Sequence, residues 1–181
     1  SDMASEDEAM QKKVRPMKAF RYTVLNSFGK KEVGTFDAEE EQDVRAFLLS
    51  QEYEILEVKE RSKYDIDINI GNKISAEDLS FSLTQLSTYI KSGIPLVESM
   101  EILSRQAKKS DTKTLYKKIV FELNKGTTFS KCLEKQGKTF PKMLINMLKT
   151  SEMTGDLTGV LDDMAAYYKQ QDTNRKQIIN A

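Results

Sequence analysis

The second half of the chain repeats one spacing of apolar side chains. In four segments, apolar residues recur three or four positions apart, which is the spacing of one face of an α-helix. The pattern therefore predicts amphipathic helices that pack their apolar faces on one another. The four sets are Leu79, Leu83, Leu86 and Ile90; Leu96, Met100, Leu103 and Ala107; Leu115, Ile119 and Leu123; and Leu157, Leu161, Met164 and Tyr168.

Three glycines separate these helical segments. Gly93, Gly126 and Gly155 each lie shortly after an apolar stripe, and another apolar residue soon follows. Glycine ends a helix at little cost because it adopts the left-handed backbone conformation. The short loop that follows makes the next helix antiparallel. We therefore predict a mainly α protein, with a six-helix antiparallel bundle over residues 75–181.

Short polar residues and one proline mark the predicted helix starts. Ser75 is placed to cap the first helix, Asp111 to cap the third and Asp156 to cap the sixth. The oxygens of such side chains accept hydrogen bonds from the free backbone N–H groups of the first turn. Pro141 fits the first turn of the fifth helix, where a proline is tolerated. A shorter fourth helix is predicted at about residues 129–136.

The first part of the chain has a strand pattern instead. Apolar and polar residues alternate over residues 20–25, Gly29 fits a turn, and a second strand is predicted at about residues 32–36. These two segments predict a β-hairpin.

A helix and a third strand are predicted after the hairpin. Asp37 is placed to cap a helix, and the strand formers of residues 53–58 follow it. We therefore predict a small β-β-α-β module over residues 18–60. The apolar face of its helix holds Val44, Phe47 and Leu48.

The remaining segments are predicted to be a flexible tail over residues 1–17, which begins with a cloning remnant, and a linker over residues 61–74. Alternating Asp and Asn residues in the linker suggest a calcium loop as an alternative. An EF-hand loop needs glycine at its sixth position and glutamate at its twelfth, where this chain has Ile70 and Ala76. An extended linker is the better interpretation, and no metal ligand is predicted.

The chemistry available to the chain is narrow. It has no histidine, which is the commonest general base and transition-metal ligand, and no glycine-rich phosphate loop. Its single cysteine, Cys132, rules out an intramolecular disulfide and favours a reducing compartment. Cys132 lies on an amphipathic helix and is predicted to be a core residue. We therefore predict no catalytic residue and no cofactor.

Charge is unevenly divided along the chain. Residues 1–60 have a net charge of −5 and residues 61–181 a net charge of +5, although the whole chain is neutral. Neither part has the dense Lys/Arg stripe of a dedicated nucleic-acid binder. The asymmetry favours mutual docking of the two parts or different protein partners.

Several short motifs occur in a fixed order along the bundle. They lie at residues 91–96, 124–130, 140–143, 151–154 and 155–161. Together they resemble the cytoplasmic domain of type II secretion F and PilC-type pilus platform proteins, over about residues 18–178. The motif residues that carry the resemblance are Gly93, Pro95, Gly126, Phe129, Pro141, Glu152, Gly155, Leu157 and Leu161.

The resemblance implies a scaffold and not an enzyme. It implies the cytoplasm-facing portion of an inner-membrane platform protein in a type IV pilus or type II secretion machine. Such platforms pass conformational work from a hexameric cytoplasmic assembly ATPase to pilin or pseudopilin subunits. The implied partners are therefore this ATPase, other inner-membrane components, pilin-like subunits and, in an oligomer, the protein itself, but no nucleic acid.

The last helix bears on the membrane context. Arg175 and Lys176 lie where a family member would enter its first membrane helix, and basic residues fit the cytoplasmic side of such a helix. We therefore expect a portion of a longer membrane protein. The alternative is an autonomous soluble helical adaptor that binds another protein with no membrane context.

Glu152 stands out as an acidic residue between Leu148 and Met153 on a largely apolar helix. The main prediction is a structural hydrogen bond to the backbone at the Gly155 turn. A partner contact, or a cation shared with Asp156, is the alternative.

Methionines and a tyrosine pair also crowd the last two long helices. They are predicted to pack structurally, with one tyrosine of the pair pointing inward. These residues are Met143, Met147, Met153, Met164, Tyr167 and Tyr168.

Overall fold

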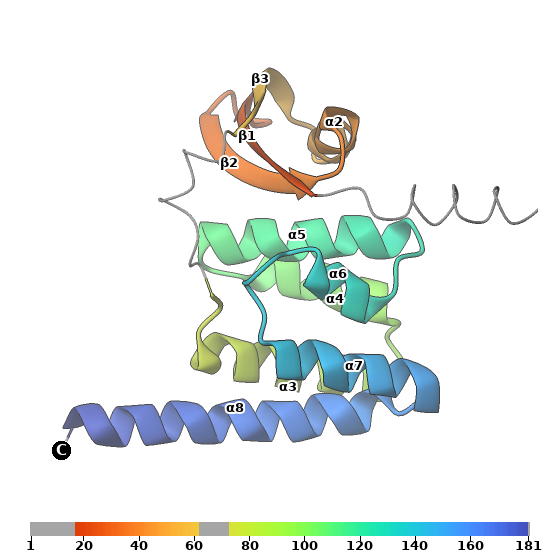
Figure 1. Cartoon of the computed structure of the whole chain (residues 1–181), viewed down its shortest axis with the longest axis vertical. Helices are drawn as coiled ribbons and strands as arrows, with labels where there is room; N and C mark the ends of the chain where they lie inside the picture. The colour runs from red at the N-terminus through yellow and green to blue at the C-terminus, as the bar shows by residue number, and fades with distance from the viewer. Residues whose placement is uncertain (1–16, 62–72, 181) are drawn as a thin grey trace, which may run out of the picture. The chain divides into compact units, whose positions relative to one another are not determined.

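The computed structural model describes residues 17–61 and 73–180. The chain divides into two compact units, Ser1–Asn69 and Ile70–Ala181 (Figure 1). The predicted tail, most of the predicted linker and the calcium-loop alternative lie outside the described residues. The predicted boundaries of the module, linker and bundle stay predictions.

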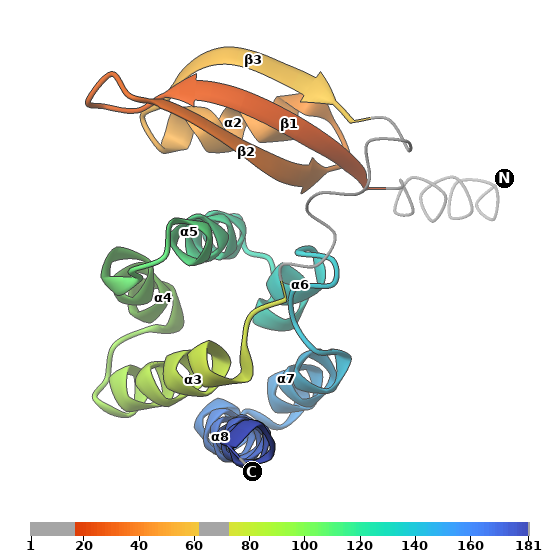
Figure 2. The same ribbon diagram turned by 90° about the vertical axis from the view of Figure 1, so that its left-hand side faces the viewer.

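The first unit has the predicted β-β-α-β order. It consists of β1 (Lys18–Leu25), β2 (Lys31–Ala38), α2 (Glu41–Ser50) and β3 (Glu54–Glu60). The strand order is β2-β1-β3, and both pairs are antiparallel. Helix α2 covers one face of this sheet (Figure 2). The buried side chains between them are Phe20, Tyr22, Val24, Phe36, Ala38, Val44, Phe47, Leu48 and Val58.

The predicted helix cap at Asp37 is wrong. Asp37 lies in β2, opposite Ala19 of β1. Helix α2 begins only at Glu41, and Glu40 at its N-cap position makes no side-chain capping bond. Pairing with β1 continues through Ala38, so the sheet ladder takes the residue that the local signal assigned to a cap.

Within residues 73–180 the second unit has six helices, as predicted, and the fold is mainly α. They are α3 (Ala76–Lys91), α4 (Leu96–Gln106), α5 (Ser110–Asn124), α6 (Phe129–Glu134), α7 (Lys142–Thr154) and α8 (Leu157–Asn180). Seen end-on in Figure 2, helices α3 to α7 form a ring, and α8 packs on α3 and α7.

The predicted apolar stripes form the core of this unit. Their inner members are buried, and Ile90, Leu96, Ala107, Leu115, Leu123 and Leu157 are partly buried around them. The buried members are Leu79, Leu83, Leu86, Met100, Leu103, Ile119, Leu161, Met164 and Tyr168.

Alternating helix directions give the helical unit two ends, visible in Figure 1. We call one the joint end, because it holds the α3–α4, α5–α6 and α7–α8 connections. The far end is formed by residues 73–78, 105–113, 136–143 and 169–180. The end of α3 meets the start of α8 at the joint end, where Lys91 pairs with Asp162.

Two of the predicted helix starts can be compared directly. Ser75 caps α3, because its hydroxyl accepts the Asp78 backbone N–H at 3.1 Å. The predicted cap at Asp111 is wrong, since α5 already begins at Ser110, after Lys109. Asp111 lies within the first turn, where its charge still complements the helix dipole.

Candidate functional site

The joint end gathers most of the predicted motif residues. Alternation of the helices brings them together, although they are spread widely along the sequence. Leu161 lies further along α8 in the core, and Pro141 lies at the far end, at the N-cap position of α7. The residues at the joint end are Gly93, Pro95, Gly126, Phe129, Glu152, Gly155 and Leu157.

The three glycines close their helices in two ways. Gly93 and Gly126 have φ angles of 93° and 91°, and each ends its helix with the paired backbone bonds of a Schellman motif. Gly155 has a φ angle of 80° and makes a single bond from its N–H to the Ser151 carbonyl at 2.8 Å. A side chain at any of them would be strained, because this backbone region favours glycine.

Glu152 of α7 holds the start of α6. Its two carboxylate oxygens accept the Ser130 backbone N–H and the Ser130 hydroxyl, both at 2.8 Å. Thr128, at the N-cap position of α6, makes no side-chain capping bond. Glu152 therefore supplies, from a neighbouring helix, the acceptor and the negative charge that a helix start favours.

This contact corrects the predicted partner of Glu152. The hydrogen bond was predicted at the Gly155 turn, but the partner, Ser130, is 22 residues away in sequence. The free N–H groups of the α6 start attract the carboxylate, whereas the Gly155 N–H is already bonded to Ser151.

Glu122 of α5 holds the opposite end of α6, through Lys135. Glu122 is only 6% exposed. Its carboxylate lies 3.0 Å from Nζ of Lys135 and 3.6 Å from Nζ of Lys125, and accepts the Thr127 hydroxyl at 3.3 Å. A buried carboxylate is tolerated when partners satisfy its oxygens in this way. One carboxylate from each adjoining helix thus holds the six-residue helix α6 in place.

Cys132 lies on α6 and is fully buried. Burial, with the Glu122 carboxylate nearby, raises the pKa of its thiol to about 12. The thiol therefore stays protonated at neutral pH, and the predicted core position is confirmed.

Two aspartates of α8 form ion pairs. Asp162 pairs with α3, and Asp172 pairs within α8 itself. Asp162 accepts hydrogen bonds from Lys91 and Ser87 of α3, and these bonds lower the pKa of its carboxyl group. Asp172 pairs with Lys176 at 3.0 Å, and this bond is the main cause of its lowered pKa. Lys176 also lies 3.6 Å from Glu77 of α3.

Asp156 caps α8, as predicted. Its Oδ1 accepts the Gly159 backbone N–H at 3.1 Å. A Cβ on Gly159 would lie 2.3 Å from Asp156 Oδ2, so this glycine leaves room for the cap. Because Asp156 and Glu152 cap different helices, the structure gives no support to a cation shared between them.

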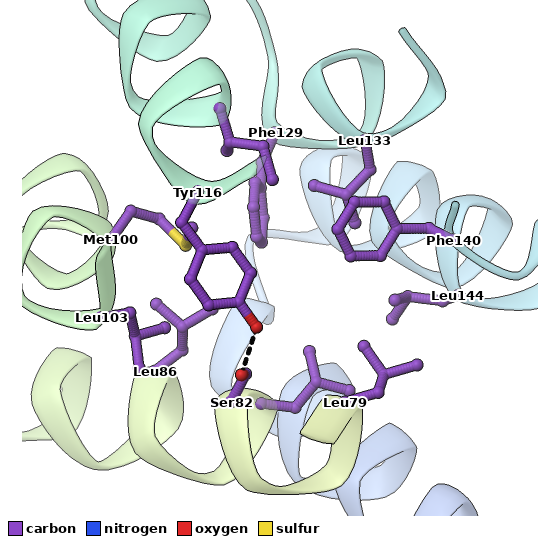
Figure 3. Close-up of a pocket in the computed structure, with 12 residues that line it drawn as sticks. Leu79, Ser82, Leu86, Met100, Leu103, Tyr116, Phe129, Leu133, Phe140 and Leu144 are labelled. Carbon is purple, nitrogen blue, oxygen red and sulfur yellow. Dashed lines mark hydrogen bonds between the residues drawn. The ribbon is translucent and has the colours of Figure 1, made fainter. Parts of the chain in front are cut away.

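A small apolar cavity lies inside the ring of helices (Figure 3). The cavity has a volume of about 20 Å³, and five helices contribute to its wall. Tyr116 of α5 and Ser82 of α3 are hydrogen-bonded across it, as the dashed line shows. The space suits one small molecule at most. The surrounding side chains include Leu79, Met100, Phe129, Leu133, Phe140 and Leu144.

Sequence reasoning missed several residues of this arrangement. Ser130 lies in the motif at residues 124–130, but nothing in the sequence paired it with Glu152, and nothing singled out Lys135, because the partners of both lie on other helices. Glu122 did give a signal, since it lies seven residues after Leu115 and therefore on the apolar face of α5. An acidic residue at such a position indicates a buried carboxylate with partners.

The predicted structural packing of the methionines is only partly correct. Met164 is buried, but Met143 is 38% exposed and Met153 is 89% exposed. Met153 lies in the last turn of α7 and faces solvent. Of the tyrosine pair, Tyr168 points inward as predicted.

Two further properties concern the described residues. Within residues 17–61 and 73–180, no three Asp, Glu or Cys side chains are grouped so that they could hold a metal ion. No helix in the same ranges is both long and apolar enough to cross a membrane.

The chain matches two family models in order. The model described as type II secretion system protein F, N-terminal domain, matches residues 17–59. The model described as type II secretion system (T2SS), protein F, matches residues 82–181.

Curated relatives match most of the chain. Type IV pilus assembly protein TapC of Aeromonas hydrophila is 27% identical over 173 residues, which cover 94% of this chain and 42% of TapC. Type II secretion system protein F of Vibrio cholerae is 26% identical over 91% of this chain and 42% of its own length. Type IV pilus assembly protein PilC of Myxococcus xanthus is 25% identical over 90% of this chain and 39% of its own length. The chain therefore spans about two fifths of the length of these relatives.

Proposed function

Because this chain belongs to the type II secretion system protein F family, we propose that it is part of the platform protein of a type IV pilus or type II secretion machine. The observation that carries the proposal is the match of both family domains in their order, one in each compact unit. The family resemblance predicted from the motifs is confirmed by these matches.

The finer proposal is that this portion faces the cytoplasm at the inner membrane. There it receives conformational work from the hexameric assembly ATPase and passes it to the pilin-like subunits. A part that transmits work needs a firm internal structure. The carboxylates that hold α6 and the contacts that hold α8 on α3 support such a role.

We also propose that the portion performs no bond chemistry. Catalysis by a carboxylate needs an oxygen that is free to reach a substrate. The candidate carboxylates are already engaged within the helical unit. Those of Glu152 and Asp156 accept backbone N–H groups at helix starts, and that of Glu122 pairs with a lysine. Their arrangement supports a structural use.

Site-specific photo-crosslinking to the purified assembly ATPase of the same system tests this proposal. Benzoyl-phenylalanine would replace three well-exposed apolar residues in turn: Phe28 (94% exposed), Leu49 (65%) and Met153 (89%). We expect at least one position to give a crosslink that an excess of unmodified chain removes. The successful position would then locate the contact surface.

Replacement of Gln170, an exposed polar residue of α8, provides the background level. No specific crosslink from any of the three positions, and no co-elution of the folded chain with the ATPase, would contradict coupling to the ATPase. That result would favour the autonomous adaptor.

A further inference from the structure

The positive charge of the helical unit is concentrated at the far end. The four segments that form it contain ten Lys or Arg residues and four Asp or Glu residues, a net charge of +6. Residues 73–180 as a whole have a net charge of +5. All of the excess positive charge therefore lies at one end, and the rest of the unit is slightly negative.

Three contacts hold these segments together as one surface. The Ile74 N–H donates to the Thr139 carbonyl at 3.2 Å, which joins the start of α3 to the α6–α7 connection. Lys109 of the α4–α5 connection pairs with Asp78 of α3 at 2.9 Å. Lys176 of α8 lies 3.6 Å from Glu77 of α3. In Figure 1 this surface is the left-hand side of the helical unit.

Many of its basic side chains are available to a partner. Lys73, Lys108, Lys138 and Lys142 are exposed and make no ion pair within the described residues. The other basic residues of the far end are Arg105, Lys109, Lys113, Lys169, Arg175 and Lys176.

Exposed apolar side chains lie beside this charge. Ile178 is 78% exposed and Ile179 is 68% exposed, in the last turn of α8 next to Lys176. Met143 at the start of α7 is 38% exposed.

The composition of the far end suits a lipid surface. Eight of its ten basic residues are lysines, whose long flexible stems reach headgroups without a fixed geometry. Basic residues next to exposed apolar ones are typical of elements that lie at a bilayer surface.

We propose that the far end of the helical unit docks on anionic phospholipid headgroups, with Ile178 and Ile179 entering the interfacial layer. This deepens the proposed function, on which it rests for its setting at a membrane, and gives the helical unit an orientation there. The joint end, with the motif residues, then faces away from the lipid.

Vesicle co-sedimentation with the whole chain tests the proposal. We expect binding to vesicles of phosphatidylglycerol and phosphatidylcholine, and little binding to phosphatidylcholine alone. Each lysine near an anionic surface strengthens binding about fivefold, so the double variant Lys138→Gln/Lys142→Gln should bind about 25-fold more weakly. Raising NaCl from about 0.05 M to about 0.5 M should also weaken binding, because salt screens the attraction.

A matched control shows whether vesicle binding depends on the position of the lysines or only on the net charge of the chain. Lys131→Gln/Lys149→Gln removes the same charge from exposed lysines nearer the joint end, and should change binding less than about twofold. Circular dichroism checks that both double variants are folded.

Equal binding to both kinds of vesicle, or equal losses in the two double variants, would overturn the proposal. No vesicle binding, with Lys138→Gln/Lys142→Gln weakening binding to the assembly ATPase, would also overturn it, in favour of an acidic protein surface. Failure of the ATPase crosslinking alone would count against the coupling role and leave the lipid result standing.

Discussion

Two carboxylates of the helical unit act at the ends of a helix other than their own. Glu152 caps α6 from α7, and Glu122 holds Lys135 at the end of α6 from α5. A helix of six residues is too short to be stable alone in water. These two carboxylates therefore make α6 depend on its neighbours.

Replacement of Glu152 tests this dependence. Glu152→Ala removes the acceptor of the Ser130 N–H and should destabilise the helical unit by about 1 kcal/mol, the usual value of a helix cap. For a unit of this size, the melting temperature should fall by about 5 °C in thermal denaturation followed by circular dichroism.

Glu134→Ala is the matched control, since Glu134 is an exposed carboxylate that pairs with Lys149 at 3.1 Å. Its loss should change stability by less than about 0.5 kcal/mol. A melting temperature unchanged by Glu152→Ala would contradict the capping role.

At the scale of elements, periodic patterns were predictable and contacts between distant segments were not. The stripe of Leu79, Leu83 and Leu86 fixed one face of α3, because helical spacing depends only on neighbouring residues. The bond from Ser130 to Glu152 joins residues 22 apart, and no local pattern specifies such a pair. The cap predicted at Asp37 failed for the same reason, since pairing with β1 decides where β2 ends.

The stability of α6 as an element can be followed through Cys132, the single cysteine. The thiol is buried, and its pKa is about 12. At pH 8 it should react with a thiol reagent at least about a hundredfold more slowly than a free thiol, because reaction requires exposure and ionisation. Glu152→Ala should speed this reaction about fivefold, as expected for an opening made easier by about 1 kcal/mol.

Labelling in urea, where both proteins are unfolded, should proceed at the same rate and serves as the control. Equal labelling rates for the two folded proteins would show that Glu152 does not hold α6 closed.

The contact between α3 and α8 should depend on pH. Hydrogen bonds from Lys91 and Ser87 lower the pKa of Asp162 in the folded state. The carboxylate of Asp162 therefore binds a proton more readily in the unfolded state than in the folded state. The stabilisation that its bonds to α3 provide is present above the ordinary carboxyl pKa and is lost as the pH falls through the lowered pKa of the folded state. Urea unfolding should show lower stability at pH 3 than at pH 6, and Lys91→Gln should reduce the difference.

Lys149→Gln, which removes a lysine from the exposed pair with Glu134, is the comparison for this pH series. An identical pH dependence in wild type, Lys91→Gln and Lys149→Gln would exclude the Asp162 contact as a cause.

At the scale of the whole molecule, each compact unit has its own core. The core of the helical unit consists of 19 buried residues between Leu79 and Tyr168, all from that unit. The separate match of each unit to a family domain agrees with this division.

The helical unit should therefore fold by itself. Residues 73–181 expressed alone should keep their helical circular dichroism and unfold in one cooperative transition, because the whole core is retained. The melting temperature should lie within about 3 °C of the corresponding transition in the whole chain. A shortened chain with no cooperative transition would show that the unit depends on the rest of the molecule.

We propose that this member of the type II secretion system protein F family binds the assembly ATPase. Sedimentation velocity of the whole chain mixed with the purified ATPase hexamer of the same system tests it most directly. We expect that, at micromolar concentrations, the chain sediments with the hexamer in a saturable complex. Separate sedimentation of the folded chain and the hexamer across the whole titration would contradict it.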